Sequence, residues 1–225
     1  MIPRWLDRVG IVYRWRAAMR LELRSLLERR PLPEPYQLGR WDPARLEEVA
    51  AVDYAAYRGT VDGRLYRGYI ASPEGCRRMW TESIGGRFGR FDPERTLLLL
   101  REEKVCGDVM VSQTLPGEAF IGNLAVHPEH RGGTGRALLL ACLWGCKEAG
   151  YERASLAVTY DNQRAFRLYQ NLGFQVVGRF PILTWQPPLG KREPRREVVP
   201  IGRPAGSNNE VGPAAGPRSG DSGSA

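Results

Sequence analysis

Apolar residues near the start of the chain recur at steps of three or four, the spacing that places side chains on one face of an α-helix. Arginines occupy many positions between them, and the prolines of "RRPLPEPY" that follow forbid the helix to continue. We therefore expect residues 1–30 to form a basic amphipathic helical arm. Such an arm could pack on its own domain, pair with a second subunit in a homodimer, or lie on an anionic membrane surface. The apolar face consists of Trp5, Val9, Val12, Trp15, Met19, Leu23 and Leu26.

Strand-like and helix-like segments alternate between residues 36 and 186. Asp42 and Asp161 precede two of the helical segments as N-caps, and Gly150 and Gly173 follow two of them as stops. This alternation predicts an α/β or α+β fold, in which helices pack on a sheet. We expect strands over 36–41, 95–103, 105–114, 118–126, 153–160 and 174–185, and helices over 42–59, 73–83, the stretch from the glycine-rich loop to about 149, and 162–173.

The chain of 225 residues has room for one domain plus extensions. From about residue 187, glycine, proline, serine and alanine dominate, so residues 187–225 are predicted to be a disordered tail. No apolar run approaches the roughly 18–20 residues that span a membrane, and arginines interrupt the stretches that a signal peptide would need. These features favour a cytoplasmic protein.

The net charge of +8 lies at the ends of the chain. Residues 1–30 hold eight arginines against three acids, and the tail from 187 holds six bases against four acids. The middle is therefore nearly neutral, which argues against nucleic acid as a partner. Four cysteines without a C-x-x-C pair and only two histidines argue against a structural zinc site, so we expect no metal.

Two stretches carry candidate chemistry. The first, "HPEHRGGTGRALLLACLWG" at 127–145, is a glycine-rich, positively charged loop that leads from a strand into an apolar helix. A helix N-terminus leaves N–H groups free for an anion, and glycines let a ligand approach the backbone closely. The spacing fits neither the dinucleotide pattern G-x-G-x-x-G nor the nucleotide pattern G-x-x-x-x-G-K-[ST]. The second, "NQRAFRLYQNLGF", fits N-x-x-A-x-x-x-Y-x-x-x-G-F, with Asn162, Ala165, Tyr169, Gly173 and Phe174 at the fixed positions.

In this order and at this separation, the two stretches resemble the GNAT (Gcn5-related) N-acetyltransferase family over about residues 36–186. The resemblance implies a mixed central β-sheet flanked by helices, in which two parallel strands splay apart to form an acyl-CoA cleft. It also implies an acyltransferase that uses acetyl-CoA as co-substrate and transfers the acetyl group to a primary amine by direct attack. The amine could belong to a small molecule, an amino acid or a protein N-terminus. A non-catalytic acyl-CoA-binding regulatory module, acting through the N-terminal arm, is the alternative.

The resemblance also assigns residues to the cleft. Tyr169 would protonate the leaving thiolate as general acid, a role that suits a phenol because it stays protonated at neutral pH. Helical spacing alone favours core packing for Tyr169 instead. Asn162 would touch the pantetheine arm. The remaining cofactor-binding residues would be Leu124, Ala125 and Val126 for the acetyl and pantetheine groups, and Arg131, Gly132, Gly133, Thr134, Gly135 and Arg136 for the pyrophosphate.

The loop departs from the family pattern P-x-x-[RQ]-x-x-G-x-G in one respect. Gly133 and Gly135 follow Pro128 one residue early, so His130 falls where Arg or Gln is usual. A loop that is one residue shorter could weaken the binding of CoA.

A general base should take the proton of the attacking amine. The candidates are Glu118, at the start of the splayed strand, and Asp53 and Asp62 on the acceptor side, although each is more often an ordinary surface acid. Gly122 has no side chain where many family members carry one near the acceptor. Residues 54–92 should form much of the acceptor site, including Tyr54, Tyr57, Asp62, Tyr66 and Tyr69.

Overall fold

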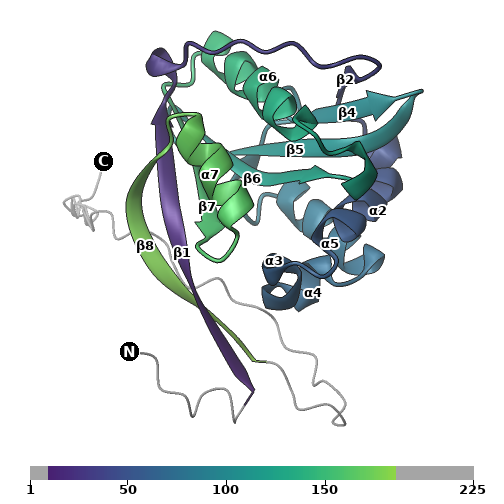
Figure 1. The fold of residues 1–225 in the computed structure, drawn as a ribbon, viewed down its shortest axis with the longest axis vertical. Helices are drawn as coiled ribbons and strands as arrows, with labels where there is room; N and C mark the ends of the chain where they lie inside the picture. The colour runs from purple at the N-terminus through teal and green to yellow at the C-terminus, as the bar shows by residue number, and fades with distance from the viewer. Residues whose placement is uncertain (1–9, 186–225) are drawn as a thin grey trace, which may run out of the picture. The chain divides into compact units, whose positions relative to one another are not determined.

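The computed structural model describes residues 10–185, which form a mixed eight-stranded β-sheet with helices on both faces (Figure 1). The strand order is β2-β4-β5-β6-β7-β1-β8, and the short β3 pairs with β5 outside this path. All neighbouring strands are antiparallel except β6 and β7, which run parallel. The strands are β1 (Ile11–Glu22), β2 (Gln37–Arg40), β3 (Arg90–Phe91), β4 (Leu97–Arg101), β5 (Lys104–Leu115), β6 (Glu118–Val126), β7 (Arg153–Thr159) and β8 (Gln175–Trp185).

Two pairs of helices cover the two faces of this sheet. Helices α6 (Thr134–Glu148) and α7 (Gln163–Asn171) lie over one face, and α2 (Leu46–Tyr57) and α5 (Pro73–Ile84) lie over the other (Figure 1). The predicted mixed sheet flanked by helices is therefore confirmed. The predicted helices and strands from residue 36 onward are present, with ends that differ by a few residues.

Residues 60–72 contain two short helices where the sequence indicated loop, α3 (Val61–Leu65) and α4 (Arg67–Ile70). The hydroxyl of Thr60 accepts a hydrogen bond from the N–H of Gly63 at 3.0 Å and so caps the start of α3. A capping threonine is a local signal for a helix start, although this helix is too short to show a periodic apolar pattern.

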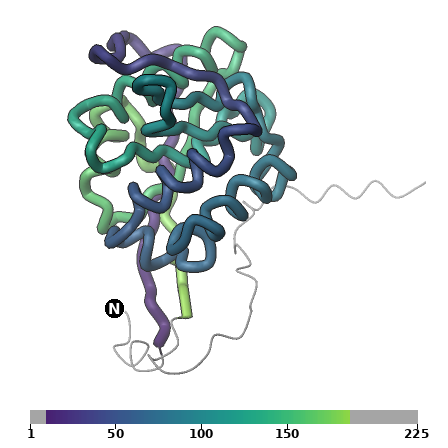
Figure 2. The backbone as a smooth tube through the Cα atoms, turned by 90° about the vertical axis from the view of Figure 1, so that its right-hand side faces the viewer, coloured from purple at the N-terminus to yellow at the C-terminus, as the bar shows by residue number. Residues whose placement is uncertain are grey.

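The predicted N-terminal helix is wrong where the structure describes it, because residues 11–22 form strand β1. This strand lies between β7 and β8 and pairs antiparallel with both. Figure 2 shows the purple N-terminal strand running beside the yellow-green β8 at the lower end of the molecule. Its side chains alternate, with Ala17, Met19 and Leu21 buried in the main core. Arg16 and Arg20 fall on the opposite face, since successive side chains of a strand point to opposite sides. Backbone pairing on both edges and this period of two outweigh the helical spacing.

The N-terminal strand also moves the predicted domain boundary. Residues 11–22 are part of the sheet rather than of a separate arm, because β1 lies between β7 and β8 in the strand order. Residues 1–9 of the predicted arm, and the predicted tail at 187–225, lie outside the described residues.

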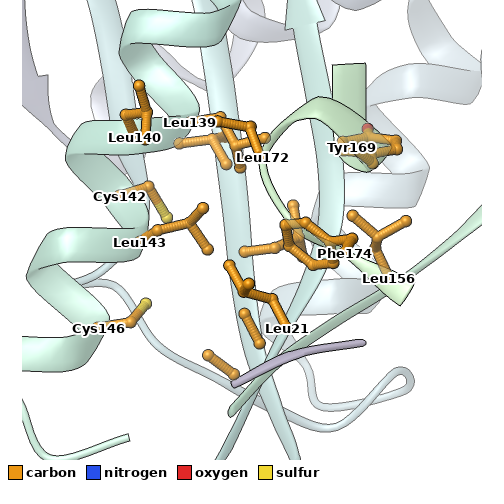
Figure 3. Packing of buried hydrophobic residues seen from close by; sticks show 14 of the residues in the cluster. Leu21, Leu139, Leu140, Cys142, Leu143, Cys146, Leu156, Tyr169, Leu172 and Phe174 are labelled. Carbon is orange, nitrogen blue, oxygen red and sulfur yellow. The ribbon is translucent and has the colours of Figure 1, made fainter. Parts of the chain in front are cut away.

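The largest core lies between α6, α7 and the sheet (Figure 3). Leu139, Leu143 and Cys146 of α6 are fully buried there, and the four cysteines of the chain are all buried and free. Burial raises the pKa of Cys106 to about 11, so this thiol is uncharged at neutral pH. A helix long and apolar enough to cross a membrane is not found in residues 10–185.

Candidate active site

Strands β6 and β7 separate after a short paired stretch. Glu118, Ala119 and Phe120 pair with the first three residues of β7, and the pairing ends there. Met110 of β5 pairs with Asn123 whereas Val111 pairs with Ile121, so one residue of β6, Gly122, is extra. Such a β-bulge bends its strand. Residues 121–126 of β6 and 156–159 of β7 do not pair with each other, and we call these two stretches the splay. They confirm the separating parallel strands that the family resemblance implied.

The glycine-rich loop at 131–136 follows the 3₁₀ turn Pro128–His130 after β6 and includes the first residues of α6, which begins at Thr134. Gly132 and Gly133 have φ angles of +113° and +108°, a left-handed region that other residues avoid. Gly133 is the N-cap of α6, and no side chain caps this helix. The first N–H groups of a 15-residue helix are therefore without a side-chain acceptor, which is the arrangement that binds anions.

The two predicted phosphate-binding arginines already contact protein groups. Arg131 donates to the carbonyl oxygens of Val126 and Ala56, at 3.3 and 2.9 Å, and so ties the loop to β6 and α2. Arg136 donates from Nε to Oε1 of Glu28 at 3.0 Å. That hydrogen bond is the main reason why the pKa of Glu28 lies below its ordinary value.

Sequence reasoning missed two further cations at the loop. A Cβ atom on Gly133 would lie 3.5 Å from Nη2 of Arg30. Burial lowers the pKa of Arg131, and the charge of nearby Arg164 lowers it further. Four arginines thus surround the loop, and we call them the loop arginines: Arg30, Arg131, Arg136 and Arg164.

Tyr169 packs in the main core, on helix α7, which follows the splayed strand β7. Its side chain is 8% exposed, and its ring packs edge-on against Phe174 with centroids 5.8 Å apart (Figure 3). Among residues 10–185, no group hydrogen-bonds its hydroxyl. Burial raises its pKa well above the ordinary value, the charge of Asp62 raises it further, and Arg16 opposes both. The phenol is therefore protonated at neutral pH, as a general acid must be, and the predicted packing is present as well.

Asp62 fastens α3 to the open end of the splay. Its Oδ1 accepts from the Thr159 hydroxyl at 2.6 Å, and its Oδ2 accepts from Asn162 Nδ2 at 2.7 Å. Asn162 also caps α7, since its Oδ1 accepts from the N–H of Ala165 at 3.2 Å. The side chain predicted to touch the pantetheine arm is thus held by two protein contacts.

A buried polar cluster lies behind the splay, between β5, β6 and α2. Asp53 and Asp108 are both 0% exposed, and Nδ2 of Asn123 donates to one oxygen of each, at 2.8 and 2.7 Å. The indole N–H of Trp80 donates to Asp53 at 2.7 Å, and the hydroxyl of Tyr57 donates to Oδ1 of Asn123 at 2.7 Å. This cluster fixes the position of the Tyr57 oxygen.

The two carboxyl groups of this cluster hold their protons unusually strongly. Burial raises the pKa of Asp53 to about 6. Burial, and then the charge of Asp53, raise the pKa of Asp108 well above its ordinary value. At neutral pH we assign the charge to Asp53 and a proton to Asp108.

Glu118 lies at the paired end of β6, away from the splay. Its Oε1 accepts from the Ser155 hydroxyl at 2.5 Å, and its Oε2 lies 3.3 Å from Nη2 of Arg20 and 3.7 Å from Nε of Arg153. These contacts stabilise a buried carboxylate and leave it remote from the open end. Of the three candidate bases, Asp62 alone lies at the splay without being fully buried.

Arg16 is a site residue that sequence reasoning missed because its segment was predicted to be a helix. It pairs with Thr159 across β1 and β7, and its guanidinium donates to the Tyr66 hydroxyl and to the carbonyl oxygen of Ala157. The structure thus brings together Tyr57, Asp62 and Tyr66 of the predicted acceptor residues. Tyr69 donates to Glu82 of α5 at 2.7 Å. The four predicted tyrosines all pack against the small core of Ala50, Ile70 and Cys76.

His127, Glu129 and His130 bring one donor atom each within 4.8 Å of one another. Glu129 and His130 lie in the 3₁₀ turn Pro128–His130, and His127 is its N-cap. Such a turn stacks side chains three positions apart. The proximity of these side chains therefore follows from the local turn.

Comparison with known proteins agrees with this arrangement. Residues 64–174 match the family model described as the acetyltransferase (GNAT) family, a range that contains the splay, the loop and α7. A mycothiol acetyltransferase of Propionibacterium freudenreichii subsp. shermanii is 30% identical over 150 residues, which are 65% of this chain and 45% of the relative. The mycothiol acetyltransferase of Thermobispora bispora is 32% identical over 164 residues, which are 71% and 52%. The chain spans about half the length of these curated relatives.

Solved structures share the fold at lower identity. The GCN5-related N-acetyltransferase of Sphaerobacter thermophilus superposes with a TM-score of 0.57 at 23% identity, over 80% of this chain and 54% of the other. The ribosomal-protein-S18-alanine N-acetyltransferase of Escherichia coli superposes with a TM-score of 0.51 at 18% identity, over 70% and 99%.

Fold, site and matches together define an acyltransferase domain. Residues 64–174 form a domain of the acetyltransferase (GNAT) family.

Proposed function

We propose that this chain transfers an acetyl group from acetyl-CoA to a primary amine by direct attack. The observation that carries the proposal is the splay, which lies between an uncapped, arginine-rich helix N-terminus and a buried, protonated tyrosine. The first feature suits the phosphates of CoA and the second suits its sulfur, and both lie where the parallel strands part.

The loop and α6 would hold the pyrophosphate. The free N–H groups and the loop arginines carry positive charge, and Glu28 offsets part of it by its hydrogen bond with Arg136. Such positive charge suits a doubly charged anion. The backbone of Leu124, Ala125 and Val126 pairs with β5 on one side only. It would hydrogen-bond the acetyl and pantetheine groups on the other side, because beyond Phe120 the β7 side of β6 has no strand partner.

Proton transfers then accompany the acyl transfer. The amine nitrogen bonds to the acetyl carbon, the carbon–sulfur bond breaks, and sulfur takes the proton of the Tyr169 hydroxyl. Each oxygen of Asp62 accepts one hydrogen bond and keeps a lone pair, so we assign Asp62 to receive the proton that the amine loses. The Tyr57 hydroxyl donates a hydrogen bond to Oδ1 of Asn123, so its oxygen keeps lone pairs that can accept an N–H of the amine.

We do not assign the acceptor of the relatives to this chain. Two proteins named mycothiol acetyltransferase support acetyl transfer as the reaction, but the chain spans about half of their length. The second candidate is an acyl-CoA-binding module without catalysis. The observation that favours it is the occupation of Arg131 and Arg136 by protein partners.

Gly135→Asp and Gly135→Ala form a matched pair to test the donor site. Gly135 has no left-handed backbone, and a Cβ there would meet Val126 at 3.3 Å in both variants. An aspartate in the first turn favours the helix but repels a phosphate. We expect calorimetry to show that Gly135→Ala binds acetyl-CoA and Gly135→Asp does not.

Thiol release with a panel of amines then separates the two candidate functions. Release that needs both acetyl-CoA and an amine supports the transferase. Tight binding of acetyl-CoA without release for any amine supports the binding module. Equal acetyl-CoA affinity in the two Gly135 variants contradicts the assigned donor site.

A further inference from the structure

Strand β1 delivers one arginine to the acceptor side of the splay. Ala17, Met19 and Leu21 point into the core beneath α6 and α7, so Arg16 points to the opposite face, where α3 and α4 lie. Its partner in the β1–β7 register is Thr159, whose hydroxyl holds Asp62. The guanidinium therefore enters at the open end of the splay, beside the groups proposed for the chemistry.

Arg16 differs from its neighbours on β1 in having no acidic partner. Arg14 lies 2.7 Å from Asp161, and Arg20 lies 3.3 Å from Glu118. No carboxylate oxygen of residues 10–185 lies within 4.0 Å of the Arg16 guanidinium. Its Nε is buried without a hydrogen-bond partner, as are those of Arg14 and Arg20, so the missing acid is what distinguishes Arg16. Asp62 already accepts hydrogen bonds on both oxygens.

The contacts that Arg16 does make orient it. One terminal nitrogen donates to the Tyr66 hydroxyl and the other donates to the backbone of Ala157. The Tyr66 ring lies 5.2 Å from the guanidinium carbon. Because the Tyr66 oxygen accepts from Arg16, its own O–H remains to be donated. Arg16 and Tyr66 together present a charge and a hydroxyl proton to the same space.

We propose that Arg16 and Tyr66 bind a carboxylate of the acetyl acceptor, so that the acceptor is an amine that carries a carboxylate, such as an amino acid. This inference rests on the proposed acetyl transfer. A guanidinium binds a carboxylate through parallel N–H donors, and a partly buried cation without a counter-ion gains most from such an anion. Arg16 is close enough to Tyr169 to act on the pKa of its phenol, so the carboxylate would lie near the reacting amine. An α-amino acid has this short separation.

The test compares amines in matched sets. The set for each amino acid contains the acid, its amide and the amine that lacks the carboxyl group. Wild type, Arg16→Gln and Arg16→Lys are compared with Arg14→Gln, a control on the same strand whose arginine pairs with the exposed Asp161. The rate of thiol release is measured at saturating acetyl-CoA, and acetyl-CoA affinity is measured separately by calorimetry.

We expect wild type to prefer the acid over its amide by about 10- to 100-fold in kcat/KM, as one charge-assisted pair provides. Arg16→Gln should lose this preference through a higher KM for the acid, so that it uses the acid and the amide with similar kcat/KM, and it should keep its affinity for acetyl-CoA. Arg16→Lys should recover part of the preference, and Arg14→Gln should behave as wild type. Arg16→Lys also answers the test if Arg16→Gln fails to fold.

Three outcomes overturn the inference. The first is equal kcat/KM for acids and amides in wild type. The second is a loss of kcat/KM in Arg16→Gln and Arg16→Lys that is equal for acids and amides. The third is acetyl-CoA binding by wild type without turnover of any amine tested. The first of these leaves the proposed acetyl transfer standing. Failure of the wild-type protein to bind acetyl-CoA overturns the proposed function itself.

Discussion

Replacing Tyr169 with phenylalanine removes one oxygen atom and keeps the ring. The ring would still pack against Phe174 at a centroid distance of 5.8 Å. The hydroxyl has no hydrogen-bond partner in residues 10–185, so its removal costs no such bond there. We therefore expect the melting temperature to change by no more than about 2 °C, which corresponds to about 0.5–1 kcal/mol in a domain of this size.

The same substitution should be severe for turnover. A positioned general acid contributes about 10²- to 10⁴-fold, so kcat should fall by that factor. The affinity for acetyl-CoA should stay within about 2-fold, because the phenol acts when the thiolate forms. A donor whose leaving thiol is more acidic needs less protonation and should recover part of the rate. Because the pKa of Tyr169 is raised, the phenol of the wild-type protein should stay protonated at mildly alkaline pH, and its deprotonation should not lower the wild-type rate there.

Tyr151→Phe is the matched control. Its hydroxyl donates to Asp92 at 2.7 Å and lies near the paired end of β7. This variant should lose about 0.5–1.5 kcal/mol of stability, as the loss of one hydrogen bond predicts, and keep its kcat. Thiol-release kinetics, calorimetry and thermal unfolding of both variants decide the matter. A wild-type kcat in Tyr169→Phe, with chemistry shown to limit the rate, would refute the acid role and leave Tyr169 as a core residue.

Three further predictions follow from the contacts of the site. Burial raises the pKa of Asp53 from 3.8 to about 6, so the folded protein binds a proton that the unfolded chain releases between these pH values. Urea unfolding should therefore show stability that falls as pH rises from about 4 to about 6, less so in Asp108→Asn, and a stability that rises over this range would contradict the assigned cluster. Glu28→Gln should tighten acetyl-CoA binding about 2- to 5-fold in calorimetry at low salt, because it removes the acid that competes for a loop arginine; weaker binding would place the phosphates elsewhere. Gly133→Ala should lower thermal stability by about 1–2 kcal/mol, because its φ of +108° strains any other residue, and an unchanged melting temperature would contradict this loop conformation.

Local patterns predicted most of the fold. Strand β6 has the bounds that its sequence indicated, because Pro128 follows it and a loop precedes it. The N-terminal strand was not predicted because Met19 and Leu23 fit both a helical face and an alternating strand. Only the pairing of β1 with β7 and β8 decides between the two, and those partners lie more than 130 residues away.

Some residues of the candidate site could be predicted from local sequence, and others could not. The glycine-rich loop and Tyr169 come from short motifs whose geometry is local, so the sequence was enough to indicate them. Arg16, Arg30 and the Asp53–Asp108 cluster depend on which strands and helices meet. Asp108 in particular lies within the apolar stretch of β5, where the alternation indicates a strand and says nothing of a carboxyl partner on α2.

The most direct test follows a labelled acetyl group from acetyl-CoA into an amine pool by mass spectrometry, with wild type, Gly135→Ala and Gly135→Asp run side by side. We expect wild type and Gly135→Ala to move the label to an amine, and Gly135→Asp to leave it on the thioester. Label that stays on CoA with wild type, or that moves equally well with Gly135→Asp, would contradict acetyl transfer at this site.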